Sequence, residues 1–380
     1  MMKRLLNGLT VLSFEQAVAA PFCTAKIADQ GARVIKVERP AVGDFARKYD
    51  KNCAGSSSYF TWLNRGKESL AVDIKDESYK RMLKNLIASG QVDIFVQNLA
   101  PGAAQRAGFG SEELRKLNDR LITLDISGYG ETGPRSHYKA YDLLVAAEAG
   151  LCAVTGSPDE PGRVGVSICD IAAGMNGYAA ILQGLYEREK TGKGSGYKVS
   201  LFDTVAEVMN VPLIQQMYTG EAPKRVGLRH PSIAPYGAFE TKDKRNILIS
   251  IQNEREWVKL CEDVLNDPQL ATNKQFDTAT NRVANRTALD STIQACFSGF
   301  LADDLIQRLL DSGVAFGELN SVEGLQQHPH LRKLEYKTED GTPVAVAAPA
   351  VIPSPEYVGD VPALGQHNEK ILHEFRHLID

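Results

Sequence analysis

Short apolar runs that read as β-strands alternate with longer helical stretches along the first third of the chain. Residues 9–14 predict a strand, residues 21–31 a helix that ends at a glycine, and residues 32–38 a second strand. Further strands, separated by helical stretches, are predicted at residues 69–74, 92–96 and 121–126. Strands joined through helices pair in parallel, so this alternation predicts an α/β fold with a doubly wound parallel sheet.

The pattern changes in the second half of the chain. At 380 residues the sequence exceeds the usual size of one domain, so two structural units are expected. After Pro223 come alternating residues at 239–241, an apolar run at 247–251 and several helical stretches. This part predicts a smaller α+β domain over residues 223–312.

Composition and charge argue against several classes of partner. A net charge of -4 and a pI near 6.0 give no general attraction to nucleic acid or to an anionic membrane. The 6 cysteines are scattered without CxxC or Cys/His spacing, which predicts reduced thiols and no metal site. The N-terminal apolar stretch is too short for a signal peptide, and no run approaches the roughly 20 apolar residues that cross a bilayer. A cytoplasmic location is therefore expected.

One acidic residue, Asp170, is predicted to lie where a strand meets a long helix. Residues 164–169 form an apolar, strand-like run, and a helical pattern extends from about residue 171 to residue 189. Exposed backbone amides at a helix start favour an ionised, oriented carboxylate, although aspartate is also a common helix cap. Small residues follow and leave room for a ligand or for a packed neighbour: Ala172, Ala173, Gly174 and Gly177. Asp170 is thus a candidate reactive carboxylate, with capping as the alternative.

Several basic residues are expected near the ligand-binding edge of the sheet. Arg39, Lys67 and Lys139 fall in loops predicted at the carboxyl ends of strands, where doubly wound folds bind ligands. They suit the phosphates of a CoA-like ligand, although each is equally explained as an ordinary surface cation. Residues 98–102 precede a helix with Arg106, which predicts an adenine or diphosphate contact or a plain turn. The missing GxGxxG and P-loop patterns argue against an ordinary dinucleotide or nucleotide site.

Ordered motifs resemble one enzyme family along essentially the whole chain. They are Glu38-Arg39-Pro40 with Gly43-Asp44, the segment 64–70, Asn98 with Pro101-Gly102, the segment 128–134, Ala140-Tyr141-Asp142, Asp170, and the segments 190–194, 230–236 and 364–367. Together they resemble the CaiB/BaiF proteins, the family III CoA-transferases.

The resemblance implies a fold, a reaction and a set of site residues. A large Rossmann-like domain would combine residues 1–222 and 313–380, with residues 223–312 as the small domain and two chains interlocked as a homodimer. Asp170 would be the nucleophile, forming first a mixed anhydride and then a thioester with CoA. Acyl-CoA would be a substrate, and no cofactor would be bound permanently. The CoA site would be lined by Arg39, Lys67, Asn98, Leu99, Arg106, Lys139 and Tyr141.

The resemblance also bears on the acid that receives CoA. The segment 229–236 is similar to that of members acting on short dicarboxylates such as succinate, glutarate, itaconate, mesaconate or citramalate. Oxalate-specific members carry a run of glycines there and a glutamine near the place of Val18, so oxalate is not expected. A guanidinium suits bidentate capture of a carboxylate, so Arg47, with Arg229 or His230, is expected to pair with the distal carboxylate of the acid. A solvated loop cation is the alternative for Arg47.

Three other functions were weighed against CoA transfer. A 2-methylacyl-CoA racemase of the same fold needs a second acid/base group, and its Gly-His-Asp pattern is replaced here by Ala140-Tyr141-Asp142. A protein that only binds CoA esters would lack the nucleophile, and Asp170 is present. An NAD oxidoreductase is disfavoured by the missing glycine fingerprint. The expected reaction is transfer of CoA from an acyl-CoA donor to a free carboxylate.

Overall fold

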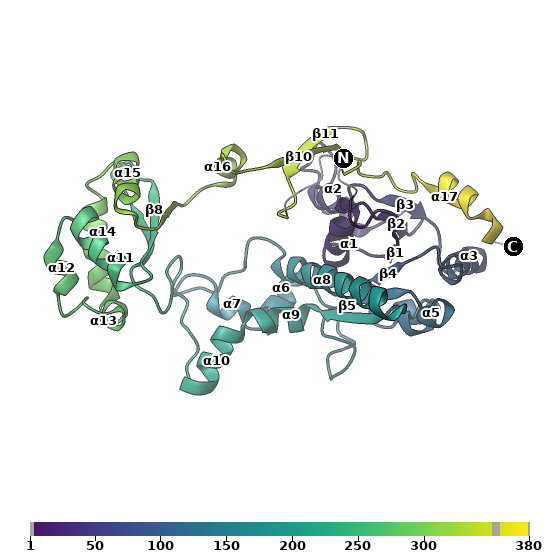
Figure 1. The fold of residues 1–380 in the computed structure, drawn as a ribbon, viewed down its shortest axis with the longest axis horizontal. Coiled ribbons are helices and arrows are strands. Elements are labelled where there is room, and N and C mark those ends of the chain that lie inside the picture. Colours follow the sequence, from purple (N-terminus) through teal and green to yellow (C-terminus); the bar gives the residue numbers. More distant parts are fainter. Residues whose placement is uncertain (1–3, 352–357, 379–380) are drawn as a thin grey trace. The chain divides into compact units, whose positions relative to one another are not determined.

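The computed structural model describes residues 4–351 and 358–378. The chain divides into two compact units (Figure 1). Unit 1 comprises Met1–Leu151, Arg163–Leu213 and Arg332–Asp380, and unit 2 comprises Cys152–Gly162 and Ile214–Leu331. Residues from both ends of the chain therefore belong to unit 1, and the expected boundaries at residues 222 and 313 fall inside unit 2.

Unit 1 is built on a 6-stranded sheet whose neighbouring strands are all parallel. This confirms the predicted α/β fold. The strand order is β3-β2-β1-β4-β5-β6, the order of a Rossmann fold. Because the winding direction reverses between β1 and β4, the carboxyl ends of these strands form the switch point where such sheets bind ligands. The strands are β1 (Thr10–Phe14), β2 (Arg33–Glu38), β3 (Glu68–Ala71), β4 (Ile94–Gln97), β5 (Ile122–Ser127) and β6 (Gly196–Ser200).

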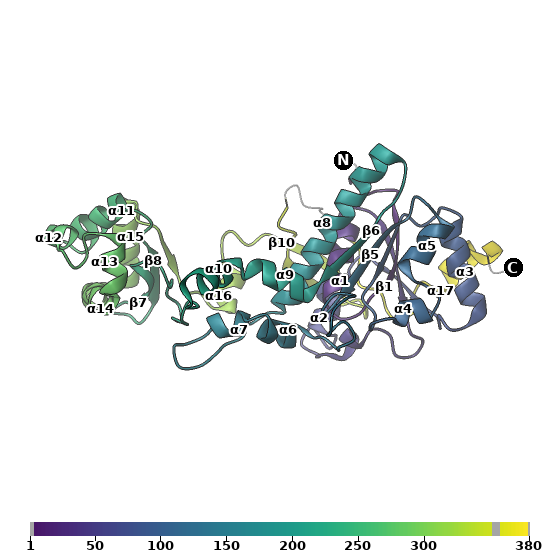
Figure 2. The same cartoon turned by 90° about the horizontal axis from the view of Figure 1, so that it is seen from below.

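Helices cover both faces of this sheet (Figure 2). On one face α1 (Ala19–Asp29) packs along the long α8 (Ile168–Thr191). On the other face α3 (Glu77–Ala88), α5 (Ser111–Leu117) and α17 (Asn368–Glu374) share a buried apolar core with the strands. The remaining helical segments of unit 1 are η1 (Phe45–Lys48), α2 (Ser58–Leu63), α4 (Ala103–Arg106), α6 (Asp142–Glu148), α9 (Leu201–Val208) and η3 (Arg376–Leu378). Two further helices, α7 (Leu151–Val154) and α10 (Asn210–Thr219), cross the boundary between the units.

The C-terminal segment completes the edge of the sheet at β3. The side chain of Asn368 accepts from the Ala71 N–H at 2.8 Å and donates to the Ala71 carbonyl at 3.0 Å. His367 Nδ1 accepts from the Ser69 N–H at 3.1 Å. An antiparallel hairpin, β10 (Lys333–Lys337) with β11 (Pro343–Ala347), precedes this segment. These contacts satisfy backbone groups that an uncovered edge strand would expose.

Unit 2 has its own sheet and its own core. Strands β7 (Tyr236–Glu240), β8 (Asn246–Ser250) and β9 (Phe316–Glu318) pair antiparallel in that order. Trp257 and the apolar faces of the helices enclose the core beside them. The helices are α11 (Glu254–Lys259), the π-helical turn η2 (Leu260–Val264), α12 (Pro268–Thr272), α13 (Ala279–Ala284), α14 (Arg286–Phe297), α15 (Ala302–Ser312) and α16 (Val322–Gln327).

Two sequence predictions about unit 1 were wrong. Residues 164–167 form no strand, and α8 begins at Ile168, so Asp170 lies inside the first turn of the helix. The edge strand β6 was not predicted, because only Ser200 of its residues is buried and an edge strand needs little apolar patterning. Among the described residues, no helix is both long and apolar enough to span a bilayer.

Candidate active site

Asp170 is partly buried at the start of α8, and its backbone is held by a second carboxylate. Asp142 Oδ1 accepts from the N–H of Cys169 at 2.7 Å and from the N–H of Asp170 at 3.3 Å. Burial, and then the charge of Asp142, raise the pKa of Asp170 to about 7. The expected ionising effect of the helix start is therefore outweighed, and the Asp170 carboxylate is considerably more basic than an exposed aspartate.

The small residues of α8 serve packing against α1 and the sheet. A Cβ on Gly174 would lie 2.5 Å from the Ala19 carbonyl oxygen, and one on Gly177 would lie 3.4 Å from Cys23 Sγ. The two helices therefore run in the same direction, and Gly174 of α8 lies beside Ala19 of α1. Asp170 precedes Gly174 by one turn on the same face of α8, the face that packs against α1, which begins at Ala19 after the β1–α1 loop of residues 16–18.

The β1–α1 loop is held from both sides. The N–H of Ala17, whose φ of 64° is unusual for a non-glycine residue, donates to Asp44 Oδ1 at 3.1 Å. Asn98 pairs with both backbone groups of Gln16, at 2.8 and 2.9 Å. Val18 is 2% exposed and provides no side-chain cap for α1. Within the described part of the chain, nothing accepts from the N–H groups at the start of α1, those of Val18, Ala19 and Ala20.

Aromatic side chains gather around Tyr49. Tyr49 makes ring contacts with Phe45 at 5.7 Å and with Tyr59 at 5.5 Å. Its pKa is raised, first by burial and then by the charges of Asp44 and Asp170. Tyr141 is 59% exposed at the start of α6. Tyr49 was not singled out in the sequence, and its only signal there is an aromatic residue soon after the Gly43-Asp44 motif.

Most of the expected CoA-binding residues follow the carboxyl ends of adjacent strands. Arg39 follows β2, Asn98 and Leu99 follow β4, and Lys139 lies between β5 and α6. Arg39 and Lys139 are exposed and make no side-chain hydrogen bond or ion pair with the described residues. Arg106 is exposed, with Nη2 donating to the Pro101 carbonyl at 3.2 Å. These residues leave several cationic groups free at the ligand-binding edge of the sheet.

Lys67 does not share this environment. It precedes β3 rather than following a strand, and it is 2% exposed. Its Nζ donates to Glu15 Oε1 at 2.7 Å, to the Pro21 carbonyl at 3.0 Å and to Asn64 Oδ1 at 3.3 Å. An ammonium group has three donors, so none is left for a phosphate. The geometry gives no support to Lys67 as a CoA ligand.

The guanidinium group of Arg47 is likewise engaged in contacts within the protein. Its Nε and Nη2 each donate to the Glu38 carboxylate at 2.9 Å, and Nη1 and Nη2 reach the Pro362 carbonyl at 3.2 Å. Nη1 also pairs with Glu339, and the guanidinium carbon lies 3.8 Å from the centre of the Phe60 ring. With these donors engaged, Arg47 joins η1 to the C-terminal segment and is not available to an acid.

The other two expected acid-binding residues belong to unit 2. Arg229 Nε lies 3.0 Å from Asp290 Oδ2, and the side chain remains 51% exposed. The ring of His230 stacks on Tyr236, and its Nδ1 accepts from the Ser232 N–H at 3.1 Å. Arg286 fixes this loop by donating to the carbonyl of His230 at 2.7 Å. The Nη atoms of Arg229 are thus free to bind an anion.

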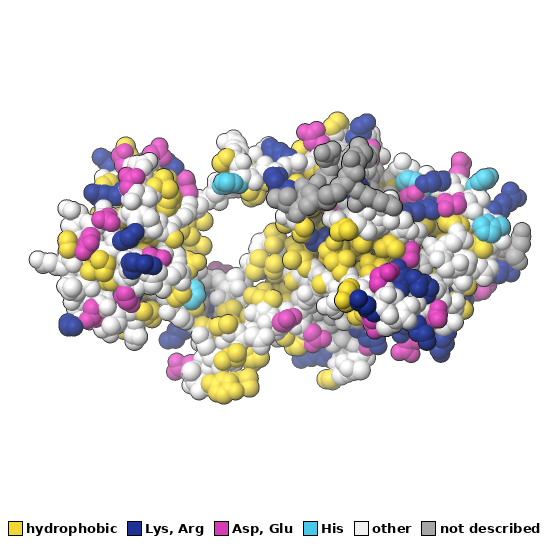
Figure 3. All heavy atoms as spheres, viewed as in Figure 1, with side chains coloured by type: hydrophobic (Ala, Val, Ile, Leu, Met, Phe, Trp, Pro, Cys, Tyr) yellow, Lys and Arg dark blue, Asp and Glu magenta, His cyan; other side chains and the backbone are white. Residues whose placement is uncertain are grey.

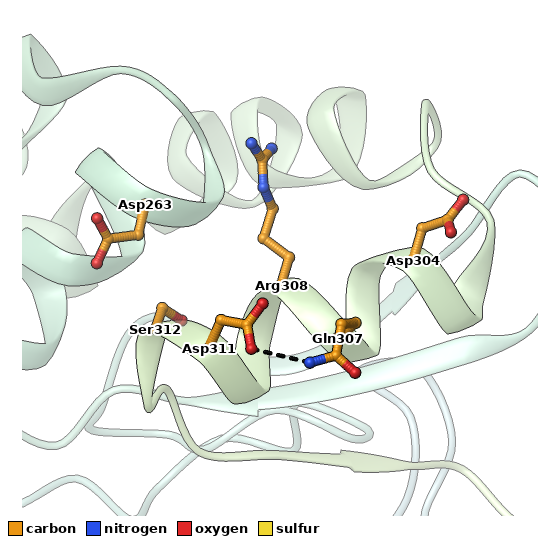
Figure 4. A pocket seen from close by; sticks show the side chains of 6 residues that line it. All are labelled: Asp263, Asp304, Gln307, Arg308, Asp311 and Ser312. Carbon is orange, nitrogen blue, oxygen red and sulfur yellow. Dashed lines mark hydrogen bonds between the residues drawn. The ribbon is translucent and has the colours of Figure 1, made fainter.

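None of the predicted residues lines the main hollows of the described chain. A hollow of about 580 Å³ in unit 2 lies between α15 and η2 (Figure 4). A smaller one of about 280 Å³ in unit 1 lies beside Asp125 and Lys198. Figure 4 shows the first to be lined by Asp263, Asp304, Gln307, Arg308, Asp311 and Ser312. Among the described residues, no three His, Cys, Asp or Glu side chains gather as metal ligands.

Comparisons with known proteins identify the family of the chain. Residues 6–368 match the model of a family described as CoA-transferase family III. Acetyl-CoA:oxalate CoA-transferase of Acetobacter aceti is 38% identical over 318 residues, covering 83% of this chain and 81% of that protein. Succinyl-CoA:glutarate CoA-transferase of Mus musculus is 34% identical over 378 residues, covering 97% of this chain and 86% of that protein.

A solved structure shows the same relationship along the chain. The crystal structure of a CaiB/BaiF family protein from Brucella suis has a TM-score of 0.83 at 30% identity, covering 98% of this chain and 100% of that one. The parallel Rossmann-like sheet, the carboxylate at the start of α8 and these matches lead to one conclusion: the chain belongs to the family III CoA-transferases, the CaiB/BaiF family.

Proposed function

We propose that this enzyme moves CoA from an acyl-CoA donor such as succinyl-CoA to a short dicarboxylic acid, with Asp170 as the covalent carrier. The observation that carries the proposal is a partly buried, basic carboxylate on the face of α8 that packs against α1, together with first N–H groups of α1 that lack acceptors among the described residues. Carboxylates attack thioesters when they are ionised and desolvated, and free N–H donors stabilise the oxyanions that form.

The reaction is a chain of acyl transfers in which no net water is consumed. Ionised Asp170 attacks the donor thioester carbonyl, giving a mixed anhydride and CoA thiolate. The thiolate attacks the Asp170 carbonyl, which releases the donor acid and leaves an aspartyl-CoA thioester. The acceptor carboxylate then displaces the thiolate to form a second anhydride. Attack of the thiolate on the acceptor carbonyl yields the new acyl-CoA and restores Asp170. The Tyr49 and Tyr141 rings help to exclude water from these intermediates.

Binding is assigned from the free groups of each unit. Arg39, Arg106 and Lys139 bind the CoA phosphates, Asn98 and Leu99 line the CoA site, and Tyr141 orients the thioester. Arg229 and His230, both of unit 2, are proposed to bind a carboxylate group. Similar enzymes are named for glutarate and for oxalate, so oxalate belongs among the acceptors to be tested.

The family resemblance and the surface of α8 support an interlocked homodimer. Figure 3 shows hydrophobic side chains gathered over this helix. Met175 is 53% exposed, Leu182 38% and Tyr186 66%. Exposed apolar side chains of this size on one helix are favourably buried against another protein surface, which we propose to be that of a second copy of this chain. Light scattering at micromolar concentration should give twice the chain mass, and a monomer would exclude this assembly.

Peptide mapping after incubation with succinyl-CoA tests the proposed chemistry. Hydroxylamine converts an acylated carboxylate to a hydroxamate, so the expected result is a modified Asp170 that is lost in Asp170→Asn. Glu189→Gln, which removes an exposed carboxylate from the same helix, should keep the modification. Acceptor acids added in turn would then name the substrate. Absence of any adduct, together with solvent deuterium at the α-carbon of a 2-methylacyl-CoA, would assign racemase activity instead.

A further inference from the structure

Four charged side chains are enclosed next to the β1–α1 loop. Glu15, Lys36, Asp44 and Lys67 are each at most 2% exposed. Lys67 Nζ lies 2.7 Å from Glu15 Oε1, and Lys36 Nζ lies 2.6 Å from Asp44 Oδ2. Lys36 Nζ is also 3.6 Å from Glu15 Oε1. The two ion pairs therefore form one buried chain of alternating charge, here called the charged cluster.

Neutral side chains complete the hydrogen bonding of the charged cluster. Asn64 Oδ1 accepts from Lys36 at 3.0 Å and from Lys67 at 3.3 Å, and Thr24 donates to Glu15 at 2.6 Å. Although burial acts to raise the pKa of Glu15, Lys67 and Lys36 lower it, so Glu15 is ionised at neutral pH. A buried ion pair adds little net stability over well-packed apolar residues, because desolvation offsets its attraction. A role in fixing geometry explains the cluster better than a role in stability.

Both ends of the charged cluster hold main chain at the start of α1. Asp44 Oδ1 accepts from the Ala17 N–H at 3.1 Å, and Lys67 Nζ donates to the Pro21 carbonyl at 3.0 Å. Ala17 has a left-handed backbone, which is strained for a non-glycine residue and persists only where contacts hold it. The cluster thereby sets the direction of the N–H groups between these anchors.

We propose that the charged cluster is a positioning device for the reaction at Asp170, and that Lys67 with Glu15 is its central pair. The inference rests on the proposed function, because the charged cluster is taken to orient backbone N–H groups at the start of α1 toward the oxyanions that form at Asp170. Lys67 is in this assignment a positioning residue that touches neither CoA nor the acid. Misplacement of a donor by about 1 Å costs on the order of 100-fold in rate.

A second buried ion pair on the same helix provides a matched control. At the other end of α1, Arg65 Nε and Nη2 donate to the Asp29 carboxylate at 3.0 and 2.5 Å. The Arg65 and Asp29 side chains are 8% and 2% exposed, so their burial resembles that of the charged cluster. This pair secures α1 without touching the loop. Loss of either pair should destabilise the fold, whereas only loss of Lys67 should disturb the loop.

The test compares Lys67→Met with Arg65→Met in steady-state kinetics, in single-turnover labelling of Asp170 and in hydrogen exchange. Lys67→Met should lower kcat and the labelling rate by about 10-fold to 100-fold and leave KM for acyl-CoA within about threefold. Backbone exchange at residues 15–20 should rise in this variant alone. Arg65→Met should lower Tm and keep kcat within about twofold. The double variant Glu15→Gln/Lys67→Met, which leaves the cluster neutral, should regain part of the lost Tm and none of the lost kcat.

The outcomes separate this inference from the proposed function. If the wild-type enzyme labels Asp170 and Lys67→Met labels it at the same rate, the positioning role is overturned and the proposed function stands. A raised KM with unchanged kcat would instead make Lys67 a CoA ligand. If the wild type forms no adduct, the proposed function fails, and the exchange comparison still decides whether the charged cluster holds the loop.

Discussion

Asp142 and Asp170 are joined through the backbone, because one Asp142 carboxylate oxygen accepts from the Asp170 N–H at 3.3 Å and from the preceding N–H of Cys169 at 2.7 Å. The same contact that fixes the start of α8 brings a negative charge near the proposed nucleophile. An acylated Asp170 is neutral, whereas free Asp170 is charged. The neighbouring charge of Asp142 therefore favours the covalent intermediates over the free carboxylate.

Asp142→Asn should move the pH dependence of the reaction. The amide oxygen can still accept from the backbone, but the negative charge is lost, so the pKa of Asp170 should fall from its value of about 7. Because Asp170 attacks in its ionised form, the acidic limb of the kcat/KM profile should move to lower pH, and kcat above the limb should fall. Profiles from pH 5 to pH 9 measure the shift. An unmoved limb would show that Asp142 does not act on this titration.

Asp170→Asn should abolish transfer and stabilise the fold at high pH. Loss of the nucleophile costs on the order of 1,000-fold or more in kcat. Burial raises the folded pKa of Asp170 above 3.8, so the folded state binds the proton more tightly and wild-type stability falls as pH rises from about 4 through 7. The asparagine variant escapes this penalty. Its Tm should exceed that of the wild type at pH 8 and match it at pH 4.5, and an equal difference at both values would contradict the burial of this charge.

Gly174→Ala should separate α1 from α8. The added Cβ would lie 2.5 Å from the Ala19 backbone carbonyl, which has no flexible side-chain end to move aside. Overpacking of this kind costs roughly 1–3 kcal/mol of unfolding free energy, and it should shift the β1–α1 loop relative to Asp170 and lower kcat. Gly165→Ala meets nothing within 4 Å and is the matched control. Urea denaturation and kcat measure both effects, and equal behaviour of the two variants would refute the close approach.

The sheet was predictable because each of its central strands is apolar on both faces. Leu12, Ile35 and Phe95 are fully buried, and β1, β2 and β4 are short, mostly buried segments rich in Val, Ile, Leu and Phe that helices separate, although Lys36 interrupts the apolar pattern of β2. The edge strand β6 lacks this signal. For residues 164–167 a strand was predicted where none forms. An apolar run can lead into a helix, as it does here, as well as form a strand.

The carboxylate proposed as nucleophile, Asp170, was singled out from the sequence, but the burial of two cations was not predicted. Nothing in the local sequence distinguishes Lys67 or Arg47 from surface cations such as Arg39. Their burial depends on partners distant in the sequence, Glu15 for Lys67 and Pro362 for Arg47. A charge is identified by its residue type, whereas its solvation is set by tertiary structure. Tyr49 was missed for the same reason.

Arg39→Gln and Lys139→Gln should weaken binding of CoA esters with little effect on folding. Both side chains are exposed and have no partner among the described residues, so their removal leaves no buried group unpaired. If they contact phosphates, KM for succinyl-CoA should rise about threefold to tenfold, while Tm stays within about 1 °C. Lys116→Gln, which removes an exposed lysine from α5, is the control for net charge.

A truncated donor separates a phosphate contact from a general electrostatic effect. Succinyl-pantetheine keeps the thioester and lacks the phosphates, so wild type and both variants should use it equally well. The difference in KM for succinyl-CoA should also shrink as salt is raised, because exposed charges are screened over about 8 Å at physiological ionic strength. Variants that lose the same factor with both donors would place Arg39 and Lys139 near the thioester and not near the phosphates.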